Sequence, residues 1–150
     1  MVTGIDIVKE QIRIAGGEKL KLQQDEVRIS GSSIECRINA EDYQNNFMPS
    51  PGKIEVLNFP GGPGVRVDSH VYCGYTISQY YDSLVAKLIV RGKDRKEAIQ
   101  IMRRALDEFI IEPIKTTIDF HREVLKNPFF VKGEFSTNFI NDNFTPGLST

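Results

Sequence analysis

Hydrophobic and polar residues alternate strictly over residues 33–42. The apolar positions of this stretch are Ile34, Cys36, Ile38 and Ala40. Such alternation is typical of a β-strand with one buried face. Arg37 lies on the polar face, flanked by carboxylates and an amide. The residues alone leave two interpretations of this arginine: a solvated face with weak cross-strand ion pairs, or a guanidinium positioned to bind an anion.

Two further segments have the pattern of strands that would join this one. Residues 27–29 are predicted to form the first arm of a hairpin whose turn is at 30–32 and whose second arm is the alternating strand. Residues 84–90 are apolar on both faces apart from Lys87, which indicates a central strand. Asp82 precedes that strand, and aspartate is common in the turn at a strand end.

The middle of the chain is rich in turn-forming residues. Residues 53–59 are predicted to form a strand with Ile54 and Val56 on one face. The glycine-rich run 60–64 follows, and no Lys-Ser/Thr pair comes after it. The next segment, 65–68, alternates like a strand. The pattern therefore favours a hairpin turn over a phosphate-binding loop.

Apolar residues recur with helical period in three segments. These are residues 3–15, 93–111 and 117–126. Asp94 and Glu97 form a capping pattern at the start of the second and longest one. We predict an α+β domain in which a mainly antiparallel sheet is covered on one side by the second and third helices.

Composition narrows the class of protein. The chain has 150 residues, 40% of them hydrophobic, and a net charge of −1, which fits one domain and provides no basic surface for nucleic acid. No apolar run is long enough to span a membrane. Cys36 and Cys73 lack a CxxC spacing and are expected to be reduced thiols, so we expect a cytoplasmic protein. His70 and His121 have no zinc-type companions, and no metal site is predicted.

The segment ECRINAED at residues 35–42 resembles a segment of biotin carboxylases. Three more blocks follow in the order that this family has, at residues 49–54, at 60–62 with 64–66, and at 81–84 with Lys87 and Leu88. The resemblance extends from residue 2 to about residue 140. The chain departs from the family at Ser32, where histidine is usual, at Pro63, where some members have an aromatic residue, and at Pro113, where glycine is usual.

The resemblance implies roles for particular residues. Arg37 would stabilise the negative charge that develops on the ureido oxygen of biotin, and Asp82 would orient Arg37. Arg66 would lie at a homodimer interface, although its pattern with Asp68 also fits a surface charge pair. The late segment that contains Thr137 and Asn138 would lie near the nucleotide. Pattern alone does not choose between these roles and the structural alternatives.

The family implies an ATP-dependent carboxylation of biotin, carried on a carrier protein, with bicarbonate and Mg²⁺. In that family the segment that matches the first helix is internal and follows the nucleotide-binding half, so the resemblance implies that the ATP-grasp motifs lie upstream of this chain. We therefore expect residues 1–140 to be the C-terminal domain of such an enzyme, with a frayed tail at 141–150. Alone, this fragment is expected to bind no cofactor tightly and to be inactive.

Acetyl-CoA carboxylase is the preferred context, with carboxyltransferase subunits as partners and fatty acid synthesis as the pathway. The alternatives are the same domain of a pyruvate or propionyl-CoA carboxylase, and a non-catalytic packing and dimerisation module. Another ATP-grasp ligase, such as a carbamoyl-phosphate synthase, lacks this run of four blocks.

Overall fold

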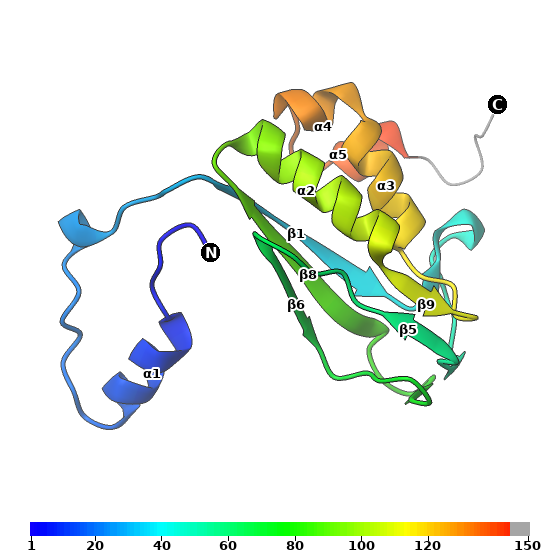
Figure 1. The fold of residues 1–150 in the computed structure, drawn as a ribbon, viewed down its shortest axis with the longest axis horizontal. Coiled ribbons are helices and arrows are strands. Elements are labelled where there is room, and N and C mark those ends of the chain that lie inside the picture. The colour runs from blue at the N-terminus through cyan, green and yellow to red at the C-terminus, as the bar shows by residue number, and fades with distance from the viewer. Residues whose placement is uncertain (145–150) are drawn as a thin grey trace.

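The computed structural model describes residues 1–144, in which antiparallel strands are covered by helices (Figure 1). The helices are α1 (Ile7–Ala15), α2 (Arg95–Glu108), α3 (Ile118–Lys126), α4 (Pro128–Lys132) and α5 (Phe139–Asn143), with 3₁₀ turns at Gln24–Glu26 and Tyr43–Asn45. The strands are β1 (Ser32–Asn39), β2 (Glu41–Asp42), β3 (Met48–Pro49), β4 (Gly52–Lys53), β5 (Val56–Asn58), β6 (Val65–Ser69), β7 (Thr76–Ile77), β8 (Leu84–Gly92) and β9 (Ile110–Glu112). The predicted α+β class is confirmed.

The main sheet has the strand order β1-β8-β6, and both pairings are antiparallel. β8 is its central strand, as the doubly apolar pattern of residues 84–90 predicted. Val85, Ala86, Leu88 and Val90 of β8 are all buried. Ala86, Leu88 and Val90 share one face of the strand, and Val85 lies on the other.

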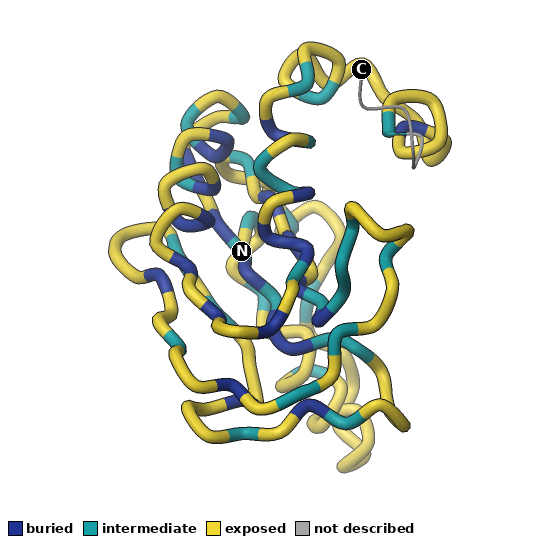
Figure 2. Tube along the Cα trace, turned by 90° about the vertical axis from the view of Figure 1, so that its right-hand side faces the viewer, coloured by how far each residue is buried: buried dark blue, intermediate teal, exposed yellow. Residues whose placement is uncertain are grey.

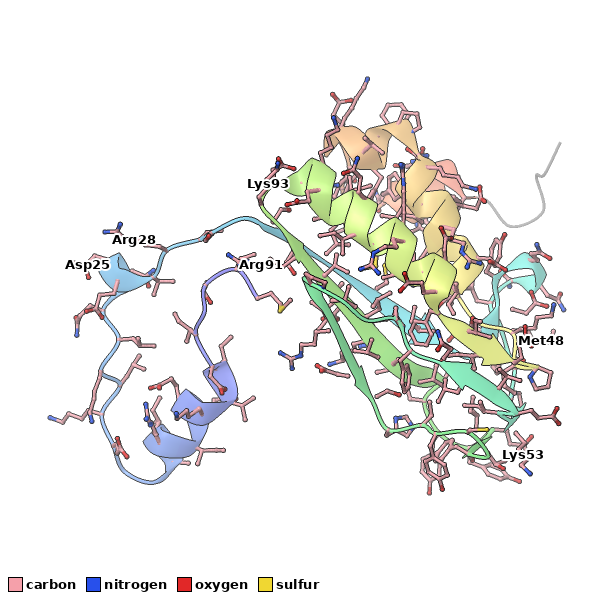
Figure 3. The ribbon with its side chains drawn as sticks, viewed as in Figure 1. Asp25, Arg28, Met48, Lys53, Arg91 and Lys93 are labelled. Carbon is pink, nitrogen blue, oxygen red and sulfur yellow. The ribbon has the colours of Figure 1, made fainter. Side chains whose placement is uncertain are left out.

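The predicted hairpin before β1 is wrong. Residues 27–29 form no strand, and β1 pairs with β8 instead, in a register that runs from Ser32 opposite Gly92. The side chain of Arg91 donates to the carbonyl of Ser30 at 3.2 and 3.3 Å, so the chain before β1 is attached to the end of β8 (Figure 3). A nine-residue apolar strand buries far more surface against β1 than a three-residue arm whose Ile29 is 77% exposed.

The predicted strand at 53–59 is divided in two. β4 pairs with β7, and β5 pairs with β9. The backbone N–H of Ile54 bonds to Tyr75, whereas the N–H of the next residue bonds to Glu112. This exchange of partners turns the chain, so Ile54 is fully buried and Val56 is 48% exposed. The prediction that these two side chains share a face is therefore wrong.

The glycine-rich run 60–64 connects β5 to β6, which belong to different sheets. It is therefore not the predicted hairpin turn. It is followed by a strand, as predicted, and not by the helix that a phosphate-binding loop requires. Two of its glycines, Gly62 and Gly64, have positive φ angles.

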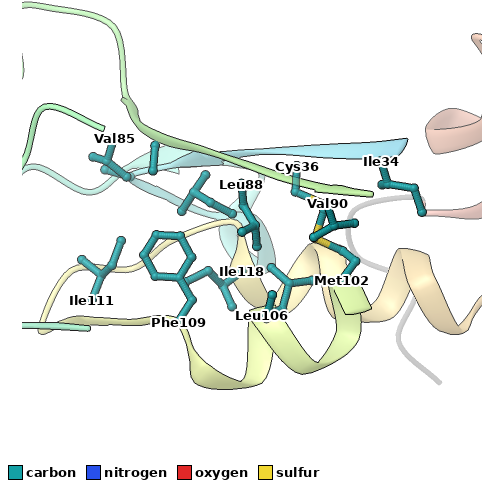
Figure 4. Packing of buried hydrophobic residues seen from close by; sticks show 14 of the residues in the cluster. Ile34, Cys36, Val85, Leu88, Val90, Met102, Leu106, Phe109, Ile111 and Ile118 are labelled. Atoms are coloured by element: carbon teal, nitrogen blue, oxygen red, sulfur yellow. The ribbon is translucent and has the colours of Figure 1, made fainter. Parts of the chain in front are cut away.

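Helix α2 covers the inner face of β8 and β1. The side chain of Asp94 accepts a hydrogen bond from the backbone of Glu97 at 2.8 Å and so starts the helix, as predicted. Its buried stripe packs on the apolar residues of the sheet, and α3 lies beside it (Figures 1 and 4). Buried residues gather between this helical layer and the sheet (Figure 2). The stripe consists of Ala98, Ile99, Met102, Ala105 and Leu106.

Helix α1 stands apart from this core (Figure 1). It begins at Ile7 and not at residue 3, because the side chain of Asp6 caps it by accepting from Lys9 at 3.0 Å. None of its residues is buried, and Ile12 is 68% exposed. Within residues 1–144, no helix combines the length and the apolar character needed to cross a membrane.

The structure describes the first residues of the C-terminal tail, whose predicted fraying stays a prediction. Helix α5 includes the first three residues of the tail that was predicted to fray at 141–150. The side chain of Asn143 donates to the carbonyl of Phe139 at 2.9 Å and accepts from Asn127 at 3.2 Å. The end of the predicted tail, 145–150, lies outside the described residues.

Candidate active site

Arg37 is held on the outer face of the main sheet. Its neighbours Cys36 and Ile38 are 5% and 0% exposed and pack beneath α2. Because side chains alternate along a strand, burial of these two residues directs Arg37 to the opposite, exposed face. The alternating pattern of β1 thus fixes the side of the sheet from which the guanidinium projects.

A second cation lies directly opposite Arg37. In the register of the main sheet, Arg37 pairs with Lys87 of β8, and Lys87 pairs with Asp68 of β6. Paired residues of antiparallel strands project from the same face, and like charges in that position repel. Two cations thus lie side by side on this face, and the nearby carboxylates are Glu35 on β1, Asp68 beyond Lys87 and Asp82 at the cavity.

Arg37 lines a cavity of about 590 Å³. This volume is in the range typical of small-molecule sites. Asp82, Tyr81 and His70 contribute polar groups, and the turn before β8 forms part of the wall. The remaining lining residues are Tyr75, Ile77, Ser78, Leu84 and Val85.

The structure brings Asp82 to the same cavity as Arg37 but does not pair them. The Asp82 carboxylate accepts a hydrogen bond from the backbone N–H of Leu84 at 2.7 Å, which is the strand-end role that the pattern allowed. No ion pair joins the two side chains in the part of the chain that the structure describes. The orienting role of Asp82 therefore stays a prediction.

Arg66 forms a bidentate ion pair with Asp68 on β6, an edge strand of the main sheet. The two hydrogen bonds measure 2.8 and 2.9 Å. The hydrogen bond raises the pKa of the Arg66 guanidinium and lowers the pKa of the Asp68 carboxyl. Both side chains are exposed, so the surface charge pair is present, and the dimer-interface role stays a prediction.

Thr137 and Asn138 are exposed residues just before α5. Neither lines the cavity of Arg37. The backbone N–H of Asn138 donates to the hydroxyl of Ser136 at 3.2 Å, which is a local turn contact. Their proposed place near a nucleotide stays a prediction. Across residues 1–144, no three His, Cys, Asp or Glu side chains are grouped to hold a metal ion.

Sequence reasoning missed Thr117 and underestimated His121. Thr117 is 5% exposed, and both side chains reach the carbonyl of Arg37, at 3.0 Å for the Thr117 hydroxyl and 2.8 Å for the His121 ring. Burial lowers the pKa of His121. The helical pattern of residues 117–126 places His121 inward, but no local signal shows that these residues meet a strand 80 positions earlier.

The two cysteines are expected to differ sharply in reactivity. Burial, with a smaller contribution from Glu35, raises the pKa of Cys36 to about 12, whereas Cys73 is an exposed free thiol. The thiolate is the reactive form, so a thiol reagent at neutral pH should modify Cys73 at least about 100-fold faster than Cys36 in the folded chain. Mass spectrometry of time points checks this, and in urea the two rates should converge. Equal native rates would contradict the burial of Cys36.

Comparison with known proteins identifies the family. Residues 35–142 match the family model described as biotin carboxylase C-terminal domain. The chain is 57% identical to biotin carboxylase 1 of Bacillus subtilis over 140 residues, which are 93% of this chain and 31% of that protein. It is 53% identical to a pyruvate carboxylase subunit of Methanothermobacter thermautotrophicus, over 99% of this chain and 30% of that one.

A solved structure agrees with these relatives. The biotin carboxylase domain dimer of Hydrogenobacter thermophilus 2-oxoglutarate carboxylase, in complex with MgADP, ADP and bicarbonate, superposes with a TM-score of 0.92 at 48% identity. The match covers 95% of this chain and 31% of the other. The chain spans about a third of the length of the proteins it matches. It belongs to the biotin carboxylase C-terminal domain family.

Proposed function

We propose that the intact protein carrying this domain is an ATP-dependent biotin carboxylase, which uses bicarbonate and Mg²⁺ to carboxylate biotin on a biotin carboxyl carrier protein. Arg37 supplies the cation that faces the negative charge developing on the ureido oxygen of biotin. The observation that carries the proposal is the fixed position of Arg37 at a cavity, on a sheet face that Lys87 makes more positive. A preorganised donor of this kind is often worth about 3–4 kcal/mol in the transition state.

The residues of this domain fit the role of holding biotin, which accepts the carboxyl group. Among residues 1–144, no hydrogen-bond acceptor occupies the guanidinium of Arg37, so its donors are available to a ligand. Asp82, at the same cavity, is proposed to orient Arg37 when the site is complete. ATP supplies the energy for activating bicarbonate, and the groups that hold ATP and Mg²⁺ are assigned to the upstream portion, with Thr137 and Asn138 near the nucleotide.

The wider context is also a proposal. We favour acetyl-CoA carboxylase in fatty acid synthesis, with carboxyltransferase subunits as partners. Because relatives are named as pyruvate and 2-oxoglutarate carboxylases, pyruvate and 2-oxoglutarate remain alternative acceptors of the carboxyl group. We also propose a homodimer with Arg66 at its interface; the formation of a homodimer, though not its interface, is supported by the dimer of the Hydrogenobacter domain. Two free cysteines suit a cytoplasmic enzyme.

A packing role accompanies the catalytic one. The exposed apolar side chains of α1, including Ile7, Val8 and Ile12, form a surface that the rest of residues 1–144 leaves uncovered. Surfaces of this kind mark contacts with other protein. We propose that the domain also packs against the upstream half of the enzyme and supports its dimer.

The test is an ATP-dependent assay of labelled bicarbonate incorporated into biotin. The intact chain should give a labelled product that requires both ATP and Mg²⁺. The fragment 1–150 should give none, because this domain contributes the acceptor side of the site and not the nucleotide-activating side. Turnover by the fragment, or none by the intact chain, would contradict the proposal.

A further inference from the structure

The outer edge of β1 is closed by a helix and not by a strand. β1 is the end strand of its sheet, with β8 on one side. On the other side, the backbone N–H of Asn39 donates to the hydroxyl of Thr117 at 3.0 Å, and the N–H of Thr117 donates to the carbonyl of Asn39 at 3.0 Å. The start of α3 therefore bonds to the strand as a neighbouring strand would.

The carbonyl of Arg37 receives two hydrogen bonds from this helix. The hydroxyl of Thr117 donates to it at 3.0 Å, and Nε2 of His121 lies 2.8 Å from it. A carbonyl oxygen only accepts, so Nε2 of His121 must carry the hydrogen. Both lone pairs of this oxygen are thus engaged, and the peptide that follows the Arg37 Cα cannot rotate without breaking them.

These contacts occur where the sheet is least regular. The register of β1 with β8 shifts between Ile38 and Asn39, one residue beyond Arg37. An irregularity of this kind bends a strand and redirects nearby side chains, and it weakens the local ladder. The helix therefore replaces backbone restraint at the point where the sheet provides least of it.

Helix α3 is itself attached to the core. The guanidinium of Arg122 donates to the carbonyl of Leu106 at 2.8 Å, and Arg103 of α2 donates to the carbonyl of Leu125 at 2.5 Å. Because α2 also packs on β8 and β1, helix α3 and its contacts to Arg37 are held in place by the same packed layer that covers the sheet. A side chain is positioned well only when its supporting groups are fixed in turn.

We propose that Thr117 and His121 are positioning residues that fix the backbone of Arg37 and thereby aim its guanidinium into the cavity. This inference rests on the proposed function, in which Arg37 is the catalytic cation. Neither residue lines the cavity, so they act through Arg37 and not on the substrate. They are contributed by a helix 80 or more residues later in the chain than the arginine they hold.

The test uses the intact enzyme and the variants Thr117→Val and His121→Leu, which keep volume and remove the polar contacts. Each should lower kcat for biotin carboxylation by about 10-fold, since misplacement by about 1 Å costs up to about 100-fold. Thr117→Ser and His121→Gln keep a donor and should stay within about 3-fold of wild type. Nucleotide binding, measured by titration, should not change in any of them.

A comparison of double variants distinguishes the loss of Arg37 positioning from a general loss of structure. In an Arg37→Ala background, Thr117→Val should lower kcat by less than about 2-fold further, because its effect runs through the missing guanidinium. Lys126→Gln is the matched control: it removes an exposed ion pair with Glu123 on the same helix, without touching β1 or the contacts that attach α3 to the core, and should leave kcat unchanged. If Thr117→Val does not fold, the His121→Leu series gives the same comparison.

The results of these experiments distinguish failure of the positioning role from failure of the proposed function. Equal losses of kcat from Thr117→Val in the two backgrounds, or failure of both Thr117→Ser and His121→Gln to restore activity, would overturn the positioning role and leave the proposed function standing. An Arg37→Ala variant with normal carboxylation would instead overturn the proposed function. Coupled losses with rescue by the conservative variants would support the inference.

Discussion

Replacing Arg37 by alanine in the intact enzyme is expected to reduce biotin carboxylation by at least about 100-fold. The guanidinium is the group that the strand presents to the cavity, and removing a preorganised donor costs transition-state binding that water does not restore. Nucleotide binding in the absence of bicarbonate should change little, since it depends on the upstream portion. Steady-state carboxylation kinetics and nucleotide titration together measure the two effects.

Two companion variants sharpen this prediction. Arg37→Lys keeps the charge but loses the planar fork of donors, so it should recover only part of the activity. Arg104→Ala removes an arginine from α2, on the helical side of the sheet, where its partners are Glu108 and the carbonyl of Gly61. It should leave kcat unchanged. Unchanged carboxylation in Arg37→Ala would remove this residue from the mechanism.

The elements that local patterns predicted well are those whose burial is decided by their own residues. β1 alternates because one face packs beneath α2, and Ala86, Leu88 and Val90 of β8, which pair with the buried residues of β1, pack beneath the same helix. Helix α2 begins where Asp94 caps it. In each case the sequence period and the burial period coincide, so the exposed position of Arg37 followed from the pattern.

The errors arose where a distant segment was the partner. Residues 27–29 were assigned to a hairpin by proximity, but β8, which lies much later in the chain, covers β1 along its whole length. The strand at 53–59 divides because its two halves bond to β7 and β9. A period of two shows that a segment is extended, and it does not show which strand lies beside it.

The candidate site shows the same limit. Arg37 and Asp82 were placed near each other by resemblance, and they do share a cavity, but the local bond of Asp82 to Leu84 is what the structure forms. Thr117 gave no signal because a threonine before a helix is ordinary in sequence. Its proposed role depends on β1 being the end strand of the sheet, and this is known only once the strand order is known.

A large loss of stability is expected from Gly64→Ala, which should lower the free energy of unfolding by about 2–4 kcal/mol. Gly64 has a φ of +75°, and an added Cβ would lie 2.5 Å from the carbonyl oxygen of Arg91. Its own carbonyl accepts from the backbone N–H of Arg91 at 2.8 Å, so the loop cannot retreat without losing that bond. Urea unfolding followed by circular dichroism measures the change.

Gly61→Ala in the same run is the matched control. Gly61 is not among the residues with positive φ, and an added Cβ there would meet nothing within 4 Å. Its effect should stay within about 0.5 kcal/mol. If both variants were equally stable, close contact with β8 would not explain the glycines, and a ligand approaching this backbone would again need consideration. A large loss at Gly64 alone would show that this glycine is required to place β6 against β8, the strand that also holds β1 and its Arg37.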